Sequence, residues 1–564
     1  MNRMNFARFL ICTALSASAA VSSTALTVPA DRTDAVRVLY TSGAKTDEMS
    51  GAMIFDESSG VKPSPYMPSG TVLHSGSALP SSYRTETTGI RNQGGSNSCW
   101  AFSGLGALEA YMSHNGRGDF DFSEQHLSWW ATKTYNDDGI GWLTPNLDYG
   151  GYSMISGGYL ASWQGPKAEE DLPYVLYGNN NLPDNMDDLE TQFGVTGIMY
   201  VNNDIESVKT AVFNYGGVAT SFNNGSGYNA DKSNYYQSYT SSYFSGHAVT
   251  IIGWDDSYSR FNFDPSDQPE QDGAWLAKNS WGDQKGDEGY LWISYYDKYV
   301  LDSIWGSNLA ITAVRTLNGY DRLYQNEIYG ATYYTYLSGE NGMIPKATFA
   351  NVFNFDDVHK YLREVIFETQ AQGAQYTVYY IPLKSGKPDT DRNNWTELAN
   401  GTADSSGYIK ADVSGAVEVS GKAAIGVEID ASKSGGWAQL GVDEWLVNSS
   451  GDYIFMPDAR KNQSFIIDGS NVYDLLDVYL ENGDEIGGTL VIKAVAGSDV
   501  LGDPNDDACV TSEDALIALR EAVGIFTGLT DLQLNNCDVN FDGVVTSEDA
   551  LMILRRSLGL LAEF

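Results

Sequence analysis

One cysteine stands in a setting that favours nucleophilic chemistry. Leu105, Leu108 and Met112 recur at helical spacing after Cys99, so the sequence predicts a helix that begins near this thiol. A thiol in the first turn of a helix lies at the positive end of the helix dipole, among aligned backbone N–H groups that favour the thiolate. The chemistry expected of Cys99 is therefore nucleophilic attack on an electrophilic carbon.

A thiolate nucleophile needs a neighbouring base. Among the five histidines, His247 heads an apolar, β-branched run that ends near Trp254 and predicts a buried strand. A second predicted strand, residues 274–278, ends directly before Asn279. If the two strands are antiparallel neighbours, the side-chain oxygen of Asn279 can orient the His247 ring. Trp281 would then shield that hydrogen bond from water.

The segment before the nucleophile supplies a candidate for transition-state stabilisation. Residues 94–98 are glycine, serine and asparagine, and they are flexible enough to fold the chain back beside Cys99. Gln93 could then direct its side-chain N–H toward a developing oxyanion, with the Cys99 backbone N–H as the second donor. Three separate segments are thus expected to converge on the thiol.

Residues 79–297 resemble papain-like cysteine peptidases of the cathepsin type. The spacing of 148 residues between Cys99 and His247 lies within the window of about 130–150 seen in that family. The blocks that carry the resemblance occur in the family's order and are Gln93, residues 98–103, 123–127, 149–152, 246–249, 278–282 and 289–293.

This resemblance implies a catalytic domain of two halves, one helical and one a β-barrel. It also implies Cys99 as nucleophile, His247 as acid and base, Asn279 as the residue that orients the ring, and Gln93 as oxyanion donor. Gly150, Gly151 and Trp281 are expected to contribute to substrate binding. The family's usual cysteine three residues before the nucleophile is replaced by Ser96, so packing or bound ions must hold the cleft in place of a disulfide.

The C-terminal part of the chain contains a duplication with a period of 35 residues, in which 510–516 recur as 545–551. Oxygen-bearing residues precede and enter each copy at the spacing of a calcium-binding loop, which predicts two Ca²⁺ ions. The expected ligands are Asp503, Asn505, Asp507, Cys509 (carbonyl), Thr511 and Asp514 in the first loop, and Asp538, Asn540, Asp542, Val544 (carbonyl), Thr546 and Asp549 in the second.

The duplication resembles a type I dockerin, a module that attaches exported enzymes to cohesin domains of a scaffoldin. Near-identity of the copies would allow binding in two orientations related by about 180°. The resemblance implies a cohesin-facing surface formed by Ser512, Glu513, Arg520, Ser547, Glu548 and Arg555. Whether Cys509 and Cys537 form a disulfide is left open by the sequence.

Composition and the remaining segments complete the predicted organisation. The 564 residues carry a formal net charge of -39, which disfavours nucleic acid as a partner. Residues 310–497 alternate in short β-rich runs typical of an antiparallel sandwich, and they resemble a lectin-like domain found behind bacterial papain-type peptidases. Carbohydrate binding is one expectation for this region, although aromatic residues in a sandwich mostly form its core.

We therefore expect a multidomain α+β protein. Its predicted parts are a signal peptide (1–20), a leader or short pro-segment (21–77), the papain-like domain (78–309), the β-sandwich (310–497) and an all-α dockerin (498–564). No stretch after the signal is long and apolar enough to cross a membrane, so the sequence predicts an extracellular protein associated with a complex or a cell surface.

The predicted function is hydrolysis of peptide bonds in proteins or peptides through an acyl-thioenzyme, with no cofactor for catalysis. An alternative is a catalytically silent papain-fold module used for binding, adhesion or inhibition. A second alternative is a related enzyme that transfers the acyl group rather than hydrolysing it. The sequence leaves open the side-chain preference and the balance between endopeptidase and exopeptidase action.

Overall fold

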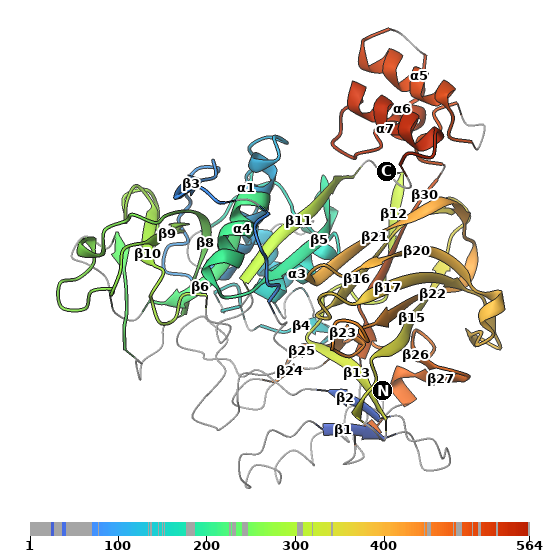
Figure 1. Ribbon diagram of the computed structural model, residues 1–564, viewed down its shortest axis with the longest axis horizontal. Helices are drawn as coiled ribbons and strands as arrows, with labels where there is room; N and C mark the ends of the chain where they lie inside the picture. The colour runs from blue at the N-terminus through green and yellow to red at the C-terminus, as the bar shows by residue number, and fades with distance from the viewer. Residues whose placement is uncertain are drawn as a thin grey trace.

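The computed structural model has three connected parts, seen from blue to red in Figure 1. The residues that it describes are 24–27, 37–40, 70–76, 78–132, 135, 138–144, 146–148, 150–151, 153–175, 186–224, 227, 233–239, 246–301, 308–317, 320–339, 342–444, 446–447, 453–477, 479–480, 488–498, 500–505, 509–525, 528–561 and 564. The predicted signal peptide and most of the leader lie outside these residues.

The first part, here called the barrel region, packs helices against both faces of its sheet. Helix α1 lies directly on β8, and a Cβ atom added to Gly106 of α1 would come within 2.7 Å of the Thr250 hydroxyl. The elements are β3 (Ser82–Arg84), α1 (Cys99–His114), α2 (Glu124–Trp130), β4 (Gly141–Trp142), α3 (Ser153–Ala161), β5 (Phe193–Val201), α4 (Ile205–Tyr215), β6 (Val218–Asn223), β7 (Asn234–Tyr235), β8 (Gly246–Asp255), β9 (Ala274–Lys278), β10 (Tyr290–Ser294) and β11 (Asn308–Thr316).

The second part, the sandwich region, is built from antiparallel strands, as the sequence predicts, and in the described residues these strands belong to more than two sheets. Its buried aliphatic and aromatic side chains, such as Phe349, Val365 and Ile425, join one hydrophobic core. Its longer strands are β12 (Asp321–Tyr324), β13 (Tyr333–Gly339), β15 (Lys346–Phe355), β16 (Tyr361–Thr369), β17 (Gln375–Ile381), β20 (Thr396–Thr402), β21 (Ser406–Glu418), β22 (Gly421–Asp430), β23 (Gln439–Glu444), β25 (Tyr453–Met456), β26 (Ser464–Asp468), β27 (Asn471–Asp474) and β30 (Ile492–Gly497).

The barrel and sandwich regions share one sheet. Within the described residues this sheet runs β12-β30-β16-β21-β5-β11-β6-β8-β9-β10-β7, and β21 of the sandwich pairs with β5 of the barrel between Tyr408 and Ile198. The predicted boundary between residues 309 and 310 falls inside β11, which pairs with β5 along its whole length. The two regions are therefore joined by backbone hydrogen bonds as well as by side-chain packing.

Two short strands of the leader lie against the sandwich region. β1 (Thr24–Thr27) pairs with β28 (Tyr479–Leu480), and β2 (Arg37–Tyr40) pairs with β13. They extend a sheet in which β13 also pairs with β23, and β23 with β29 (Gly488–Leu490). The described part of the leader thus contacts the sandwich region by strand addition.

The third part is a small helical module with its own core. Its helices are α5 (Ser512–Ala522), α6 (Asp531–Cys537) and α7 (Ser547–Ser557), and α5 packs against α7. Ala515, Ala518, Ala550 and Ile553 form the centre of its core. The sequence predicts one helix after each loop, and the structure adds α6 before the second loop. In the described residues, no helix is both long and apolar enough to span a bilayer.

Candidate active site

Cys99 is the first residue of α1, so the predicted helix begins at the candidate nucleophile. The thiol is buried, and burial is the larger effect on its pKa, which it raises. The backbone N–H groups of Ala248, Trp100 and Cys99 itself act on the thiol in the opposite direction and lower its pKa. Because Ala248 directly follows His247, its influence on the thiol places the sulfur near the start of strand β8 and the candidate base.

His247 lies near the start of β8, which pairs antiparallel with β9 as predicted. Its Nε2 lies 2.7 Å from Oδ1 of Asn279. The Asn279 oxygen only accepts hydrogen bonds, so Nε2 carries the proton and Nδ1 is left to accept one. Burial lowers the pKa of His247 to about 4, and the hydrogen bond to Asn279 opposes this shift.

Trp281 covers the histidine–asparagine pair. Its ring is stacked on the His247 ring with 4.6 Å between centroids and 23° between planes. On the other side, Phe222 contacts the same imidazole edge-on at 5.7 Å. The aromatic cover excludes water from the 2.7 Å hydrogen bond and restricts rotation of the ring.

Gln93 lies in the same buried site and is held at both ends of its amide. Its Oε1 accepts a hydrogen bond from the Ser280 hydroxyl at 2.5 Å, and its Nε2 donates to the Ser96 carbonyl at 2.7 Å. A primary amide has two N–H groups, so one of them is not used by the Ser96 contact. Ser280 is a positioning residue that the sequence analysis did not single out, although it directly follows Asn279.

Hydrogen bonds occupy the place of the disulfide that Ser96 cannot form. The Ser96 hydroxyl donates to Ser98 Oγ at 3.1 Å, and Ser98 Oγ lies 2.8 Å from the Tyr174 hydroxyl. That hydroxyl also donates to the Gln93 carbonyl at 3.1 Å, and the Tyr174 ring packs edge-on against Phe102. Tyr174 therefore ties together both ends of the loop that leads to Cys99.

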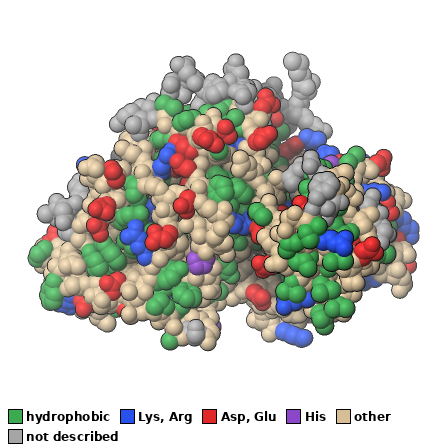
Figure 2. Space-filling model, turned by 90° about the horizontal axis from the view of Figure 1, so that it is seen from above, with side chains coloured by type: hydrophobic (Ala, Val, Ile, Leu, Met, Phe, Trp, Pro, Cys, Tyr) green, Lys and Arg blue, Asp and Glu red, His purple; other side chains and the backbone are tan. Residues whose placement is uncertain are grey.

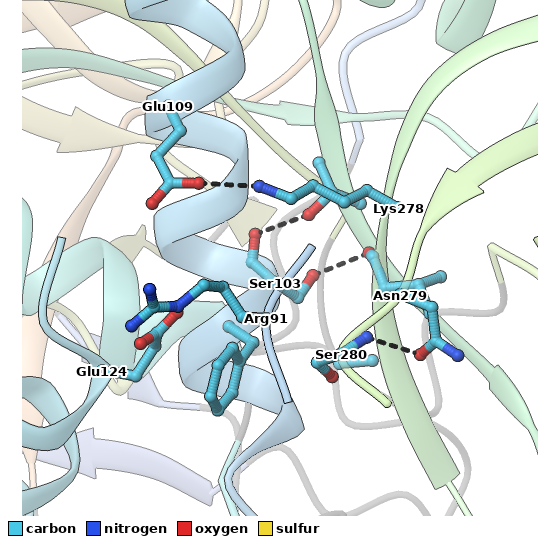
Figure 3. Close-up of a pocket in the computed structure, with 11 residues that line it drawn as sticks. Arg91, Ser103, Glu109, Glu124, Lys278, Asn279 and Ser280 are labelled. Carbon is cyan, nitrogen blue, oxygen red and sulfur yellow. Dashed lines mark hydrogen bonds and ion pairs between the residues drawn. The ribbon is translucent and has the colours of Figure 1, made fainter. Parts of the chain in front are cut away.

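A buried ion pair connects the two halves of the barrel region. Figure 3 shows Glu109 on α1 and Lys278 at the end of β9 pointing toward each other. Lys278 Nζ lies 2.9 Å from Glu109 Oε2, and both contact the Thr88 hydroxyl. Since Lys278 directly precedes Asn279, this pair fixes the position of the asparagine relative to α1.

A second carboxyl group, Glu124, lines the small cavity beside this ion pair (Figure 3). The cavity has a volume of about 10 Å³, room for about one water molecule. Burial, together with the nearby Glu109, raises the pKa of Glu124 well above its ordinary value. Its Oε2 is buried without a hydrogen-bond partner, which is consistent with a protonated carboxyl or a bound water.

The residues predicted for substrate binding lie at or near this site. Gly150 and Gly151 are both buried, and a Cβ atom on Gly151 would come within 2.6 Å of the Trp100 indole. The absence of a side chain at Gly151 is thus required by packing against the residue after Cys99. Contact of the Gly150–Gly151 backbone with substrate stays a prediction.

The acidic segment 255–272 forms a loop that is mostly exposed or half-buried. Asp255 and Asp264 accept hydrogen bonds from nearby serines, Ser257 and Ser266. Asp272 accepts from the Arg260 backbone, and Asp267 from Ser238. In this segment, whose residues are all described, no three acidic, histidine or cysteine side chains gather in the form of a metal site.

The second predicted calcium loop is described in full. Asp538 accepts from the backbone N–H groups of Asp542 and Gly543, at 3.1 and 2.9 Å, and Asn540 Oδ1 also accepts from Asp542. Asp549 caps α7 through a reciprocal box with Thr546. Gly543 has a φ of 87°, the left-handed conformation that its position in a calcium loop requires.

The chemistry of this loop fits a hard divalent cation. Burial raises the pKa of Asp538 to about 6, and the charges of Asp549 and Asp542 add to the rise. A Ca²⁺ ion would relieve that repulsion, and Asp538, Asn540, Asp542 and Asp549 provide the oxygens that it prefers. In the first loop, Asp514 Oδ1 is buried without a partner, whereas Asp507 lies outside the described residues.

The six residues predicted to face cohesin are all exposed. Next to them the structure exposes apolar side chains that the sequence analysis did not include: Leu516 and Leu519 on α5 with Val523 directly after it, and Leu551 and Leu554 on α7 with Leu558 directly after it. Each member of the first set corresponds to one of the second at the 35-residue period. In Figure 2, green and blue side chains lie together at the lower right, the end of the molecule where Figure 1 places this module.

The cysteines of the helical module are not joined in the described part of the chain. Cys509 is exposed, whereas Cys537 is buried in the module's core. Burial and neighbouring carboxylates raise the pKa of Cys537 to about 12, which disfavours its thiolate. Of the three cysteines that the structure describes, Cys99 is thus the one placed at a helix start beside a histidine.

Family comparisons agree with the three parts of the fold. Residues 80–303 match the papain family cysteine protease domain, residues 323–496 the lectin-like domain, and residues 501–557 the dockerin type I domain. Curated relatives include cathepsin S of Bos taurus, 28% identical over 211 residues, and a cathepsin L-like protein of Caenorhabditis elegans, 30% identical over 217 residues. These alignments cover 36% and 37% of this chain and 55% and 56% of those proteins, so the chain spans about half the length of such relatives.

A solved structure resembles this chain over a longer range. The cysteine protease and lectin-like domains of Cwp84, a surface layer associated protein of Clostridium difficile, are 34% identical with a TM-score of 0.67. The match covers 77% of this chain and 91% of that one. A cysteine-to-alanine variant of Cwp84 after propeptide cleavage gives 34% identity, a TM-score of 0.66 and coverage of 74% and 99%. The chain therefore belongs to the papain family of cysteine proteases, with a lectin-like domain behind the protease domain and a type I dockerin after it.

Proposed function

We propose that this protein is an exported cysteine endopeptidase that hydrolyses peptide bonds and is attached to a larger complex through its dockerin. The observation that carries the catalytic part is the geometry at the start of α1. There the Cys99 thiol lies at the first residue of the helix, close enough to the Ala248 backbone beside His247 for that N–H to lower its pKa, and His247 Nε2 is held 2.7 Å from Asn279 Oδ1. Membership of the papain family supports the same reaction class.

In the proposed acylation step, the proton of the Cys99 thiol passes to Nδ1 of His247. The sulfur then attacks the carbonyl carbon of the scissile bond, and the carbonyl oxygen becomes an oxyanion. The Cys99 backbone N–H and the unused N–H of Gln93 are the expected donors to that oxygen. His247 then gives its proton to the leaving amine as the carbon–nitrogen bond breaks, which leaves a thioester on Cys99.

Water completes the cycle by hydrolysing the thioester. His247 takes a proton from the attacking water, and the carbon–sulfur bond breaks to release the carboxylic acid. Asn279 accepts the Nε2–H bond throughout, so the ring keeps the orientation that both steps need. The Trp281 ring shields that hydrogen bond from water, which would otherwise compete for the Nε2–H group.

The proposed attachment rests on the dockerin, a family whose members generally bind calcium. We propose two Ca²⁺ ions, one in each loop, and a cohesin domain of a scaffoldin as the partner. The support is the pair of symmetry-related surfaces on α5 and α7, each combining exposed serine, glutamate and arginine with exposed leucines. Apolar side chains that remain exposed on a small domain are characteristic of an interaction surface. The signal-like start of the sequence supports secretion, which suits an extracellular complex.

The test is proteolysis of casein by the calcium-loaded full-length chain, together with labelling by a thiol-directed epoxide. We expect casein fragments and one label at Cys99, and both should be lost in Cys99→Ala. Cys509→Ala, which removes an exposed thiol and keeps the backbone carbonyl, is the matched control and should retain both. A correctly folded protein that neither cleaves casein nor reacts at Cys99 would instead be a papain-fold binding or inhibitor module.

A further inference from the structure

Phe541 of the second calcium loop is buried against the rest of the protein. Only 8% of this residue is exposed, although it lies in a loop of a small module. Its carbonyl accepts hydrogen bonds from Nη2 of Arg117 at 3.2 Å and from the backbone N–H of Thr316 at 3.1 Å. Its ring lies 3.9 Å from the guanidinium carbon of Arg315. The partners come from the turn after α1 and from the end of β11, so they belong to the papain-family domain and its junction with the lectin-like domain.

The cation that meets the Phe541 ring is held rigidly. Arg315 is 2% exposed and forms ion pairs with Asp321 on β12 and with Glu364 on β16, the second at 3.0 Å. A guanidinium fixed in this way cannot move away from the ring, so its attraction to the aromatic face costs little conformational entropy. The junction therefore presents a preformed receptor for one aromatic residue.

Phe541 has an uncommon backbone conformation. Its φ is 57°, a left-handed conformation that is uncommon for residues other than glycine and strained for a bulky one. The corresponding position of the first copy is Asp506, which lies outside the described residues. At this position the first loop has an aspartate, whereas the second has an aromatic side chain that contacts Arg315 of the same chain.

The surroundings of this contact are partly open. A cavity of about 490 Å³ lies between the module and the junction, lined by Thr316, Tyr320, Glu521, Leu534, Asn535 and Asp538, among others. The chain that connects β30 to the module is also short, running from Ser498 to Val500. Phe541 is therefore a point of close contact at the edge of a cavity, where the loss of one side chain can loosen the interface.

We propose that the second calcium loop docks the dockerin on the junction of the papain-family and lectin-like domains, and that calcium binding and docking strengthen each other. Asn540 and Asp542, two of the expected calcium ligands, flank Phe541 on either side. An ion that fixes their oxygens also fixes the left-handed backbone between them, which is the conformation that the receptor binds. By reciprocity, a loop held in that conformation by Arg117 and Arg315 binds calcium more tightly. The exposed leucines of α5 and α7 remain open to a partner in the docked state.

The experiment uses the full-length chain and one variant on each side of the contact. Phe541→Asp introduces the residue of the first copy, and Arg117→Gln shortens and neutralises the side chain outside the dockerin that donates to the Phe541 carbonyl. Arg322→Gln, which alters an exposed ion pair with Asp356, is the matched control. Calcium affinity is measured by titration calorimetry, and domain arrangement by small-angle X-ray scattering with calcium or with chelator. Neither readout depends on peptidase activity, so failure of the proposed enzyme reaction would not affect the result.

We expect calcium affinity to fall less in Arg117→Gln than in Phe541→Asp. Calcium affinity of one of the two sites should fall by at least about fivefold in both variants, the lower end of typical coupling, and stay unchanged in Arg322→Gln. Calcium should also make the wild-type chain more compact in scattering, but not Phe541→Asp. Arg117→Gln keeps the loop sequence intact, so its affinity is informative even if Phe541→Asp folds poorly. Unchanged calcium affinity in Arg117→Gln, or scattering of the wild type that does not respond to calcium, would overturn the proposal.

Discussion

Lys278 Nζ lies 2.9 Å from Glu109 Oε2, and the two residues join the strand that ends directly before Asn279 to the helix that begins at Cys99. Both side chains are almost completely buried, so neither charge can be solvated if the other is lost. The relative position of nucleophile and orienting amide thus depends on an ion pair that takes no part in the chemistry.

Removal of either Lys278 or Glu109 alone should therefore lower the free energy of unfolding. Lys278→Met leaves the Glu109 carboxylate buried and unpaired, and we expect a loss of about 3–5 kcal/mol in the free energy of unfolding. The double variant Lys278→Met/Glu109→Gln should recover much of that loss. Breaking the exposed pair Lys360–Glu418 by Lys360→Met is the control and should cost under about 1 kcal/mol. Urea titrations followed by fluorescence measure all of these changes, and equal losses at the two sites would contradict the account.

The Asn279 side chain should matter for catalysis more than for folding. Asn279→Ala removes the acceptor that keeps the proton on Nε2 of His247. A buried hydrogen bond to a charged ring is worth about 1.5–3 kcal/mol, so kcat/KM for a peptide substrate should fall roughly 10- to 150-fold. The loss should lie mainly in kcat. A variant with unchanged kcat would show that another group orients the ring.

Tyr174 should stabilise the loop before the nucleophile through its hydroxyl. Tyr174→Phe keeps the packing against Phe102 but removes contacts to Ser98 and to the Gln93 carbonyl. We expect a destabilisation of about 1 kcal/mol per lost hydrogen bond and a lower kcat, because Gln93 and Cys99 become less well positioned. Tyr379→Phe in the lectin-like domain provides the control. Thermal unfolding and steady-state kinetics measure both effects, and identical behaviour of the two variants would count against the role of Tyr174.

Calcium should stabilise the dockerin. Chelation leaves Asp538 close to the charges of Asp542 and Asp549. An ion present at about 100 times its Kd adds about 2.7 kcal/mol to apparent stability, so the calorimetric transition of the dockerin should move to a lower temperature with chelator. Asp549→Asn should reduce the response to calcium. Superimposable calorimetric scans with calcium and with chelator would argue against occupied loops.

Local patterns predicted much of this structure. The helical spacing after Cys99, the β-branched run after His247 and the strand before Asn279 each correspond to an observed element. The pairing of β8 with β9 follows because the chain returns directly through the exposed insertion. The two capping boxes at Thr511 and Thr546 form as the duplicated sequence implies.

Contacts between distant segments could not be predicted in the same way. The ion pair of Glu109 with Lys278 joins residues 169 positions apart, and the pairing of β5 with β21 crosses a predicted domain boundary. Neither has a local signature, because each depends on how whole elements pack. Helix α6 did have a local sequence signal, because Thr530 and Gln533 form a capping box at its start. Phe541 was visible as a difference between the two copies, but its receptor on the junction was not.

The most direct test of the central claim is the pH dependence of alkylation at Cys99, measured by mass spectrometry of the peptide that contains it. If thiol and imidazole share one proton, the sulfur should remain reactive down to pH about 4, where His247 takes up a second proton. In His247→Ala the imidazole is absent. Because burial raises the pKa of Cys99, the thiol should then react only at a pH above the ordinary pKa of a thiol. Identical pH profiles for the wild type and His247→Ala would contradict the assignment of these residues as a catalytic pair.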